Sequence, residues 1–143
     1  MVANTLESDA DLRQLIEASR SVAVVGMKSE PAEDAYRVPL YLQRHGHRIL
    51  PVNPKLDLIL GERAFHSLQE IGVAVDLVNL FRAPDHIPGH VEQILDMRPR
   101  PRAVWMQLGI VHGAAAARLR AEGLQVVQDR CIMVEHRRLL SER

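Results

Sequence analysis

Five short, predominantly apolar runs, spaced along the whole chain, most strongly constrain its fold. They cover residues 22–25, 49–52, 75–80, 103–106 and 124–127. Apolarity that is nearly continuous rather than alternating is typical of strands that are buried on both faces, as in parallel sheets. Parallel neighbours need long crossover connections, which are usually helices. The runs therefore predict the strands of a parallel sheet with helices on both faces.

The segments between these runs carry helical signals. Helices are predicted at about 8–19, 36–45, 85–97 and 112–122, with a short terminal helix from about residue 129. Ser8 and Asp11 are spaced as in a capping box, and Gly46 and Gly123 supply left-handed stops after two of the helices. Pro39 fits the second helix only if it lies in the first turn, because proline lacks the N–H that a helix interior uses.

One stretch, 54–67, is too irregular for a full helix and is predicted to carry a short edge strand around 58–60. Alternating strands and helices favour right-handed crossovers and a doubly wound sheet. We therefore expect a single α/β domain over residues 1–143, with an N-terminal helix within 1–20 and a Rossmann-like core of five parallel strands over 21–140.

Composition excludes several classes of protein. The 143 residues include 18 basic and 18 acidic side chains, so the broad basic surface of a nucleic-acid-binding protein is absent. No apolar run approaches the roughly 20 residues of a membrane span, and the N-terminus lacks the pattern of a signal peptide. The single cysteine excludes an internal disulfide and a multi-cysteine zinc site. We expect a cytoplasmic protein without nucleic-acid or membrane partners.

The residues that directly follow the strands are the candidates for binding, because ligands of open α/β sheets bind beyond the carboxyl ends of the strands. Four of the five segments after the strands carry a cation, which favours a phosphorylated ligand. These segments are 26–29, 53–55, 81–84, 107–109 and 129–131.

The first of these segments lacks the glycines of a standard dinucleotide site. The G-x-G-x-x-G fingerprint is reduced to Gly26, although backbone N–H groups after it, Lys28 and the following helix start at Tyr36 and Arg37 could hold a pyrophosphate. The acidic residue that binds the ribose of NAD is missing after the second strand, where Lys55 instead invites an extra phosphate. The residues alone leave two ligands open: CoA with its 3′-phosphate, and NADP with its 2′-phosphate.

Several segments of the chain resemble the small, stand-alone CoA-binding-domain family, which is similar to the CoA-binding Rossmann domain of the succinyl-CoA synthetase alpha subunit. The resemblance runs from about residue 21 to residue 140 and is most specific in V-N-P-K at 52–55 and W-M-Q-L-G at 105–109. It also includes V-V-G at 24–26, Y-R-V at 36–38, G-E at 61–62, V-N-L-F-R at 78–82 and D-R-C at 129–131.

The resemblance implies coenzyme A, or an acyl-CoA, as the ligand. It would place the diphosphate on 26–29 with help from Arg37, the adenosine beside 52–55 and the pantetheine near 107–109, with Phe81 and Arg82 lining the cleft. The residues and the resemblance together predict these cofactor-binding positions: Gly26, Met27, Lys28, Ser29, Arg37, Val52, Asn53, Pro54, Lys55, Phe81, Arg82, Gln107, Gly109, Asp129, Arg130 and Cys131.

The chain departs from the synthetase pattern, because its first loop keeps a single glycine and we expect no second domain carrying a phosphorylated histidine. Ligase chemistry is therefore not carried over. We expect a non-catalytic carrier or sensor of CoA, with a protein partner or a homodimer left open. The alternatives are an NADP-linked oxidoreductase, a CoA-transferase-like enzyme and a nucleotide-sensing regulatory domain.

Three side-chain groups are candidates for chemistry. Cys131 lies at the predicted N-terminus of the last helix, beside Arg130, and could form a mixed disulfide with CoA, although single cysteines are more often buried and inert. His86 and His90 are spaced i, i+4 without an evident third ligand, so a solvated helix face is favoured over a metal site. His136 is predicted to pack at the end of a helix. No catalytic residue and no metal site are predicted.

Overall fold

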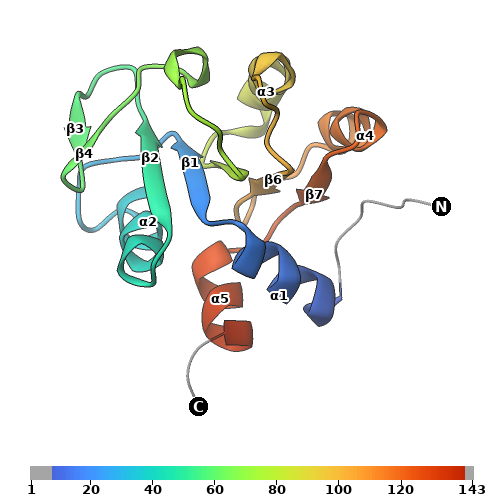
Figure 1. Cartoon of the computed structure of the whole chain (residues 1–143), viewed down its shortest axis with the longest axis horizontal. Helices are drawn as coiled ribbons and strands as arrows, with labels where there is room; N and C mark the ends of the chain where they lie inside the picture. Colours follow the sequence, from blue (N-terminus) through green and yellow to red (C-terminus); the bar gives the residue numbers. More distant parts are fainter. Residues whose placement is uncertain (1–7, 141–143) are drawn as a thin grey trace.

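Five parallel strands form the sheet at the centre of the computed structural model, which describes residues 8–140 (Figure 1). The strands are β1 (Ser21–Val25), β2 (Arg48–Val52), β5 (Leu77–Leu80), β6 (Ala103–Met106) and β7 (Gln125–Val127), in the spatial order β2-β1-β5-β6-β7. Val25, at the end of β1, is level with Val52 on one side and Leu80 on the other. The prediction of a doubly wound, Rossmann-like sheet of five parallel strands is confirmed.

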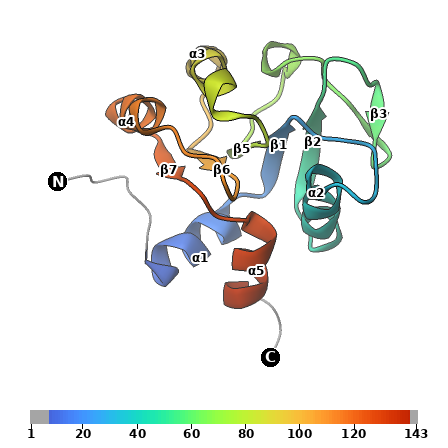
Figure 2. The same ribbon diagram turned by 180° about the vertical axis from the view of Figure 1, so that it is seen from behind.

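Helices cover both faces of the sheet (Figures 1 and 2). One face carries α1 (Asp9–Ala18), α2 (Asp34–Arg44) and α5 (Ile132–Leu140), and the other carries α3 (Ile87–Asp96), α4 (Gly113–Ala121) and the short helix η1 (Leu68–Glu70). Side chains of a strand alternate between the faces. Val24 and Trp105 therefore pack beneath the first set of helices, and Val25 and Met106 beneath the second. Because both faces are buried, the strands are apolar on both.

The order of the strands reverses next to β1. From β1 the chain crosses through α2 to β2 on one side, and it then passes to β5 on the other side of β1. The segments that leave the carboxyl ends of β1 and β5 therefore lead to opposite faces, toward α2 and α3 respectively. Ligands of open α/β sheets bind in the crevice at such a point.

Pro39 lies inside α2 rather than in its first turn, because the helix begins at Asp34 and not at the predicted Tyr36. A proline at this position leaves the carbonyl of Ala35 without the N–H donor that a helix normally supplies. The N–H of Lys28 donates to this carbonyl at 3.2 Å. The loop after β1 is therefore bonded to α2 through the acceptor that the proline leaves open.

The stretch after β2 forms a hairpin: the predicted short strand around 58–60 is present, and it pairs within a separate two-stranded sheet. β3 (Leu58–Ile59) pairs antiparallel with β4 (Glu62–Arg63). Leu60 and Gly61 connect them with φ angles of 58° and 74°, the left-handed values of a two-residue hairpin turn. Phe65 then runs beside the end of β2, where its N–H and its carbonyl each form a hydrogen bond of 2.8 Å. The tight turn therefore returns the chain to β2 before a longer strand can form.

An aromatic cluster joins the C-terminal end of α2 to α5, at the edge of the sheet opposite the crevice. The hydroxyl of Tyr41 lies 2.8 Å from Nδ1 of His136, and the ring of His45 stacks on Tyr41. His136 is only 6% exposed, but it lies in the middle of α5 and not at its end as predicted. Burial holds the pKa of His136 below its usual value, and the neighbouring His47 and His45 lower it further.

This cluster predicts a loss of stability in acid. Because the pKa of His136 is lower in the folded chain than in the unfolded chain, protonation favours unfolding, and stability decreases as the pH falls through about 6.5. The melting temperature should therefore fall between about pH 7.5 and about pH 5.5, and His136→Gln should reduce that fall.

The matched control for this measurement is His86→Gln, because His86 is exposed. The control should keep the full decrease in melting temperature. An equal decrease in the His136 variant and the parent chain would contradict the assignment.

Candidate functional site

Gly26, directly after β1, lies against the loop that follows β5. Its φ angle is 82°, and a Cβ atom built on it would lie 2.3 Å from the carbonyl oxygen of Phe81 and 3.0 Å from Cδ of Arg82. Any side chain here would push these two residues away. The glycine is therefore required by contact between two loops of the chain itself, a reason that the sequence did not reveal.

Hydrogen bonds fasten the loop after β1 to its neighbours. The N–H of Gly26 donates to the carbonyl of Val52 at 3.1 Å. Asn53 bridges the two loops: its Nδ2 donates to the carbonyl of Met27 at 2.8 Å, and its Oδ1 accepts from the N–H of Lys55 at 2.7 Å. The amide of Asn53 thus sets the position of both loops.

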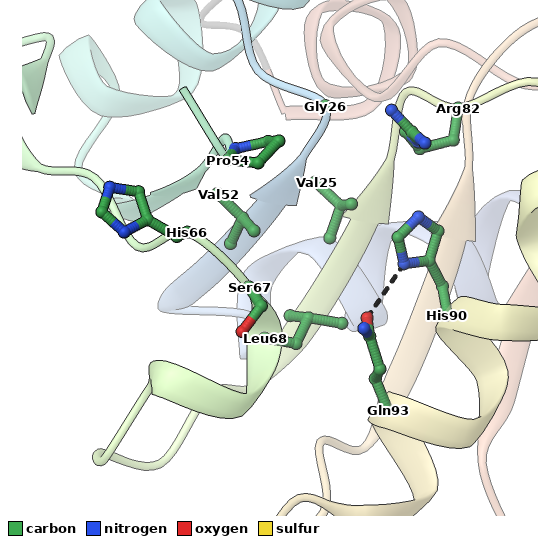
Figure 3. A pocket seen from close by; sticks show the side chains of 10 residues that line it. All are labelled: Val25, Gly26, Val52, Pro54, His66, Ser67, Leu68, Arg82, His90 and Gln93. Carbon is green, nitrogen blue, oxygen red and sulfur yellow. Dashed lines mark hydrogen bonds between the residues drawn. The ribbon is translucent and has the colours of Figure 1, made fainter. Parts of the chain in front are cut away.

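A cavity of about 100 Å³ opens on the α3 side of this loop, and we call it the α3-side cavity. Apolar side chains from the ends of β1 and β2 form its floor, together with Leu68 of η1 (Figure 3). The polar side chains of Arg82, His90 and Gln93 lie toward α3, whereas His66 and Ser67 lie across the cavity from it (Figure 3). Its lining residues are Val25, Gly26, Val52, Pro54, His66, Ser67, Leu68, Arg82, His90 and Gln93.

Two polar side chains in the α3-side cavity have buried nitrogen atoms without a hydrogen-bond partner among residues 8–140. They are Nε of Arg82 and Nε2 of His90. The other ring nitrogen of His90, Nδ1, lies 3.0 Å from Oε1 of Gln93. Burial lowers the pKa of His90, the hydrogen bond to Gln93 opposes this, and Arg82 and His86 add to the lowering. The ring is therefore neutral at pH 7.

A second cavity, of about 290 Å³, lies between the start of α2, the loops after β5 and β6 and the start of α5, and we call it the α5-side cavity. Arg37 stands at its edge, where it pairs with Asp34 of the same helix. Cys131, half-buried, immediately precedes α5, so that helix begins later than the predicted residue 129. The lining residues are Asp34, Arg37, Val38, Phe81, Gln107, Leu108, Ile110, Cys131, Met133 and Val134.

The loops after β6 and β7 are bonded to each other and to α5. Oε1 of Gln107 accepts a hydrogen bond from the N–H of Ile132 at 3.0 Å. Asp129 accepts one from the N–H of Gly109 at 2.7 Å, and the carbonyl of Arg130 accepts one from the indole of buried Trp105 at 2.7 Å. These groups position the wall of the α5-side cavity.

The structure brings the predicted binding residues to different places. Gly26, Val52, Pro54 and Arg82 line the α3-side cavity, and Arg37, Phe81, Gln107 and Cys131 line the α5-side cavity. Lys28, Ser29 and Lys55 are exposed beside the cavities, whereas Asn53, Gly109, Asp129 and Arg130 form contacts between loops. Met27 is fully buried, and its side chain packs in the core on the α2 face instead of at the cleft.

Sequence reasoning missed part of the α3-side cavity. The interpretation of His90 as part of a solvated helix face is wrong, because its ring is half-buried and lines this cavity. One signal could have identified it: His90 shares the i, i+3, i+4, i+7 stripe of α3 with the buried Ile87, Val91 and Ile94. Segment 66–68 gives no local signal, since it reaches the cavity only through the hairpin.

Between residues 8 and 140, no three His, Cys, Asp or Glu side chains are placed so that they could bind a metal ion together. No helix in the same part of the chain is both long and apolar enough to span a membrane. The chemistry that the site offers is that of binding, with apolar walls, cations at the edges and unpaired hydrogen-bonding atoms in one cavity.

Comparisons with known proteins agree with this geometry. A family described as the CoA binding domain matches residues 20–137. The uncharacterized protein YneT of Bacillus subtilis is 36% identical over 129 residues, which are 90% of this chain and 94% of YneT.

Solved structures of similar length share the fold. A protein from Thermus thermophilus is 38% identical with a TM-score of 0.88, and the match covers 94% of this chain and 100% of that one. A hypothetical protein from Pyrococcus horikoshii is 33% identical with a TM-score of 0.89, and 94% of each chain is covered.

The contact at Gly26 predicts that Gly26→Ala destabilises the fold. A left-handed conformation costs an alanine about 1–2 kcal/mol, and the collision with Phe81 adds about 1–3 kcal/mol. We expect urea unfolding to report a loss of about 2–5 kcal/mol in the free energy of unfolding, the sum of these two contributions.

Gly109 provides a matched control, because its φ is 85° but a Cβ built on it meets nothing within 4 Å. Gly109→Ala should therefore lose only the conformational part, about 1–2 kcal/mol. Equal losses in the two variants would show that the collision at residue 26 contributes nothing.

Proposed function

The chain belongs to the CoA binding domain family, and from this premise we propose that it binds coenzyme A or an acyl-CoA across the carboxyl edge of its sheet. The observation that carries the proposal is the presence of two cavities at the carboxyl edge of the sheet, one lined by Arg82 and the other by its neighbour Phe81. CoA has adenosine at one end, a diphosphate in the middle and pantetheine at the other end, so each end of the ligand could occupy one cavity.

We place the adenosine in the α3-side cavity. The apolar side chains of Val25, Val52 and Leu68 line it together with a few polar groups, a combination that is usual for ligand pockets. Lys55 is exposed in the loop after β2, next to Pro54, which lines this cavity. The ammonium group of Lys55 would then bind the 3′-phosphate on the ribose.

The diphosphate would lie over the loop after β1, which contains Gly26 and Lys28. The N–H groups of Gly26 and Lys28 already donate to carbonyls of the protein, so they are not free to cradle a phosphate in this conformation. Side-chain charge therefore has the larger part in our proposal. Lys28 is exposed on the loop, and Arg37 would exchange its contact with Asp34 for a phosphate oxygen.

Pantetheine would extend into the α5-side cavity. Most of its wall is apolar, with Phe81, Leu108 and Met133 among the lining side chains, and its volume is about 290 Å³. The ligand in this proposal is either CoA with a free thiol or an acyl-CoA. Cys131 lines the same cavity, so the thiol of CoA would approach it.

The function proposed is that of a carrier or sensor that holds CoA without transforming it. The rival functions are those of an NADP-linked oxidoreductase and of a nucleotide-sensing domain, because Lys55 could bind a 2′-phosphate as well as a 3′-phosphate. Ligand preference separates these functions, whereas the fold does not.

Isothermal titration with CoA, dephospho-CoA, NADP and NAD tests the proposal. CoA should bind most tightly, and dephospho-CoA about tenfold more weakly, because a charge-assisted contact is lost at an exposed site. Lys55→Ala should weaken CoA binding by the same factor and leave dephospho-CoA binding unchanged.

Lys28→Ala is the matched control, since its charge lies near the diphosphate that both ligands share. It should weaken the binding of CoA and dephospho-CoA equally. Binding of NADP or NAD without binding of CoA would overturn the proposal and favour the oxidoreductase or the nucleotide sensor.

A further inference from the structure

Two hydrogen-bonding atoms that line the α3-side cavity have no hydrogen-bond partner within residues 8–140. Nε2 of His90 and Nε of Arg82 are both buried and both lack a partner. Figure 3 shows that the ring nitrogen of His90 that is not bonded to Gln93 lies on the side of the ring that faces Arg82. Buried polar groups of this kind are expected to find a partner when a ligand binds.

The contact with Gln93 determines which of these groups donates and which accepts. Oε1 of Gln93 is a carbonyl oxygen and can only accept, so Nδ1 of His90, 3.0 Å away, carries the proton. The ring is neutral, since burial lowers its pKa and the facing charges of Arg82 and His86 oppose protonation. Nε2 is therefore a hydrogen-bond acceptor. Nε of Arg82 always carries its proton and is a donor.

A donor beside an acceptor matches one edge of adenine. Adenine presents the N7 acceptor next to the N6 amino donor, whereas guanine and hypoxanthine present two acceptors at the same edge. The side chains of Val25, Val52 and Leu68 line the same cavity and offer apolar contact to the faces of a planar ring. The cavity thus combines apolar walls with one donor and one acceptor that complement the N7 and N6 atoms of adenine.

We infer that Arg82 and His90 form an adenine-reading pair in which Nε–H of Arg82 donates to N7 and Nε2 of His90 accepts from the N6 amino group. Gln93 is a positioning residue, because it holds the proton of His90 on the nitrogen away from the base. The inference rests on the proposed function, in which the adenosine of CoA occupies this cavity. It adds the basis on which the site would reject other purines.

The test compares CoA with its hypoxanthine analogue, in which an oxygen replaces the amino group, by isothermal titration. The parent chain should bind CoA at least about tenfold more tightly, because the oxygen of the analogue and Nε2 of His90 are both acceptors and cannot form a hydrogen bond. His90→Phe should bring this ratio close to one. Gln93→Leu should also reduce it, although His90 is still present, because the proton position is no longer fixed.

Two further variants complete the design. Arg82→Lys keeps the positive charge but loses the Nε–H donor, and it should weaken both ligands alike, since both contain N7. His86→Phe is the matched control, because His86 is exposed one turn before His90, and it should leave the ratio unchanged. Circular dichroism and melting temperature establish that each variant is folded.

The outcomes separate this inference from the proposed function. Tight binding of CoA with no discrimination between the bases, or discrimination that survives in folded His90→Phe, overturns the adenine-reading pair and leaves CoA binding intact. If CoA does not bind, the same comparison is made with ADP and IDP. A preference for ADP that is lost in His90→Phe would support the pair alone, and binding of neither nucleotide would overturn both proposals.

Discussion

The contact between Gly26 and the carbonyl of Phe81 is the constraint on which the site depends. A Cβ atom at residue 26 would lie 2.3 Å from that oxygen, so the loops after β1 and β5 can lie this close only if the residue is glycine. The two loops then lead to opposite faces of the sheet, and Arg82 and Phe81 of the second loop line one cavity each. The single glycine serves packing within the protein. In a dinucleotide fingerprint the second glycine lets the backbone approach the pyrophosphate, and the third allows close packing of helix and strand.

Most of the fold could be predicted because the strands are buried on both faces. The run 103–106 was identified as a strand from apolarity alone, and its residues are fully buried in the sheet. The helix around Pro39 was placed less well, since the rule for proline in helices considers only the helix itself. The N–H of Lys28, which donates to the carbonyl of Ala35, lies outside the helix. Patterns within the helix segment cannot predict such a contact. The short strand around 58–60 is predicted, but its partner at 62–63 is not, because the pairing depends on the turn between them.

The candidate site could be predicted in outline only. The rule that ligands bind at carboxyl ends of strands identified Arg82 and Phe81, which line one cavity each. The rule does not distinguish side chains that face a cavity from those that pack within the protein. Met27, for example, is a core residue. His90 was assigned to the surface, because a histidine on a helix is usually solvated. Its place on the apolar stripe of α3 was the better guide.

The hydrogen bonds of the loop after β1 also affect the entropy of ligand binding. Its Gly26 and Lys28 N–H groups and its Met27 carbonyl are all bonded within the protein. The freedom of this segment is therefore lost when the chain folds, and a ligand does not have to order it again. Rigid sites of this kind bind with a smaller entropic penalty than loops that close around their ligand. Association would then depend on diffusion and on the shape of the incoming molecule rather than on a slow rearrangement of the protein.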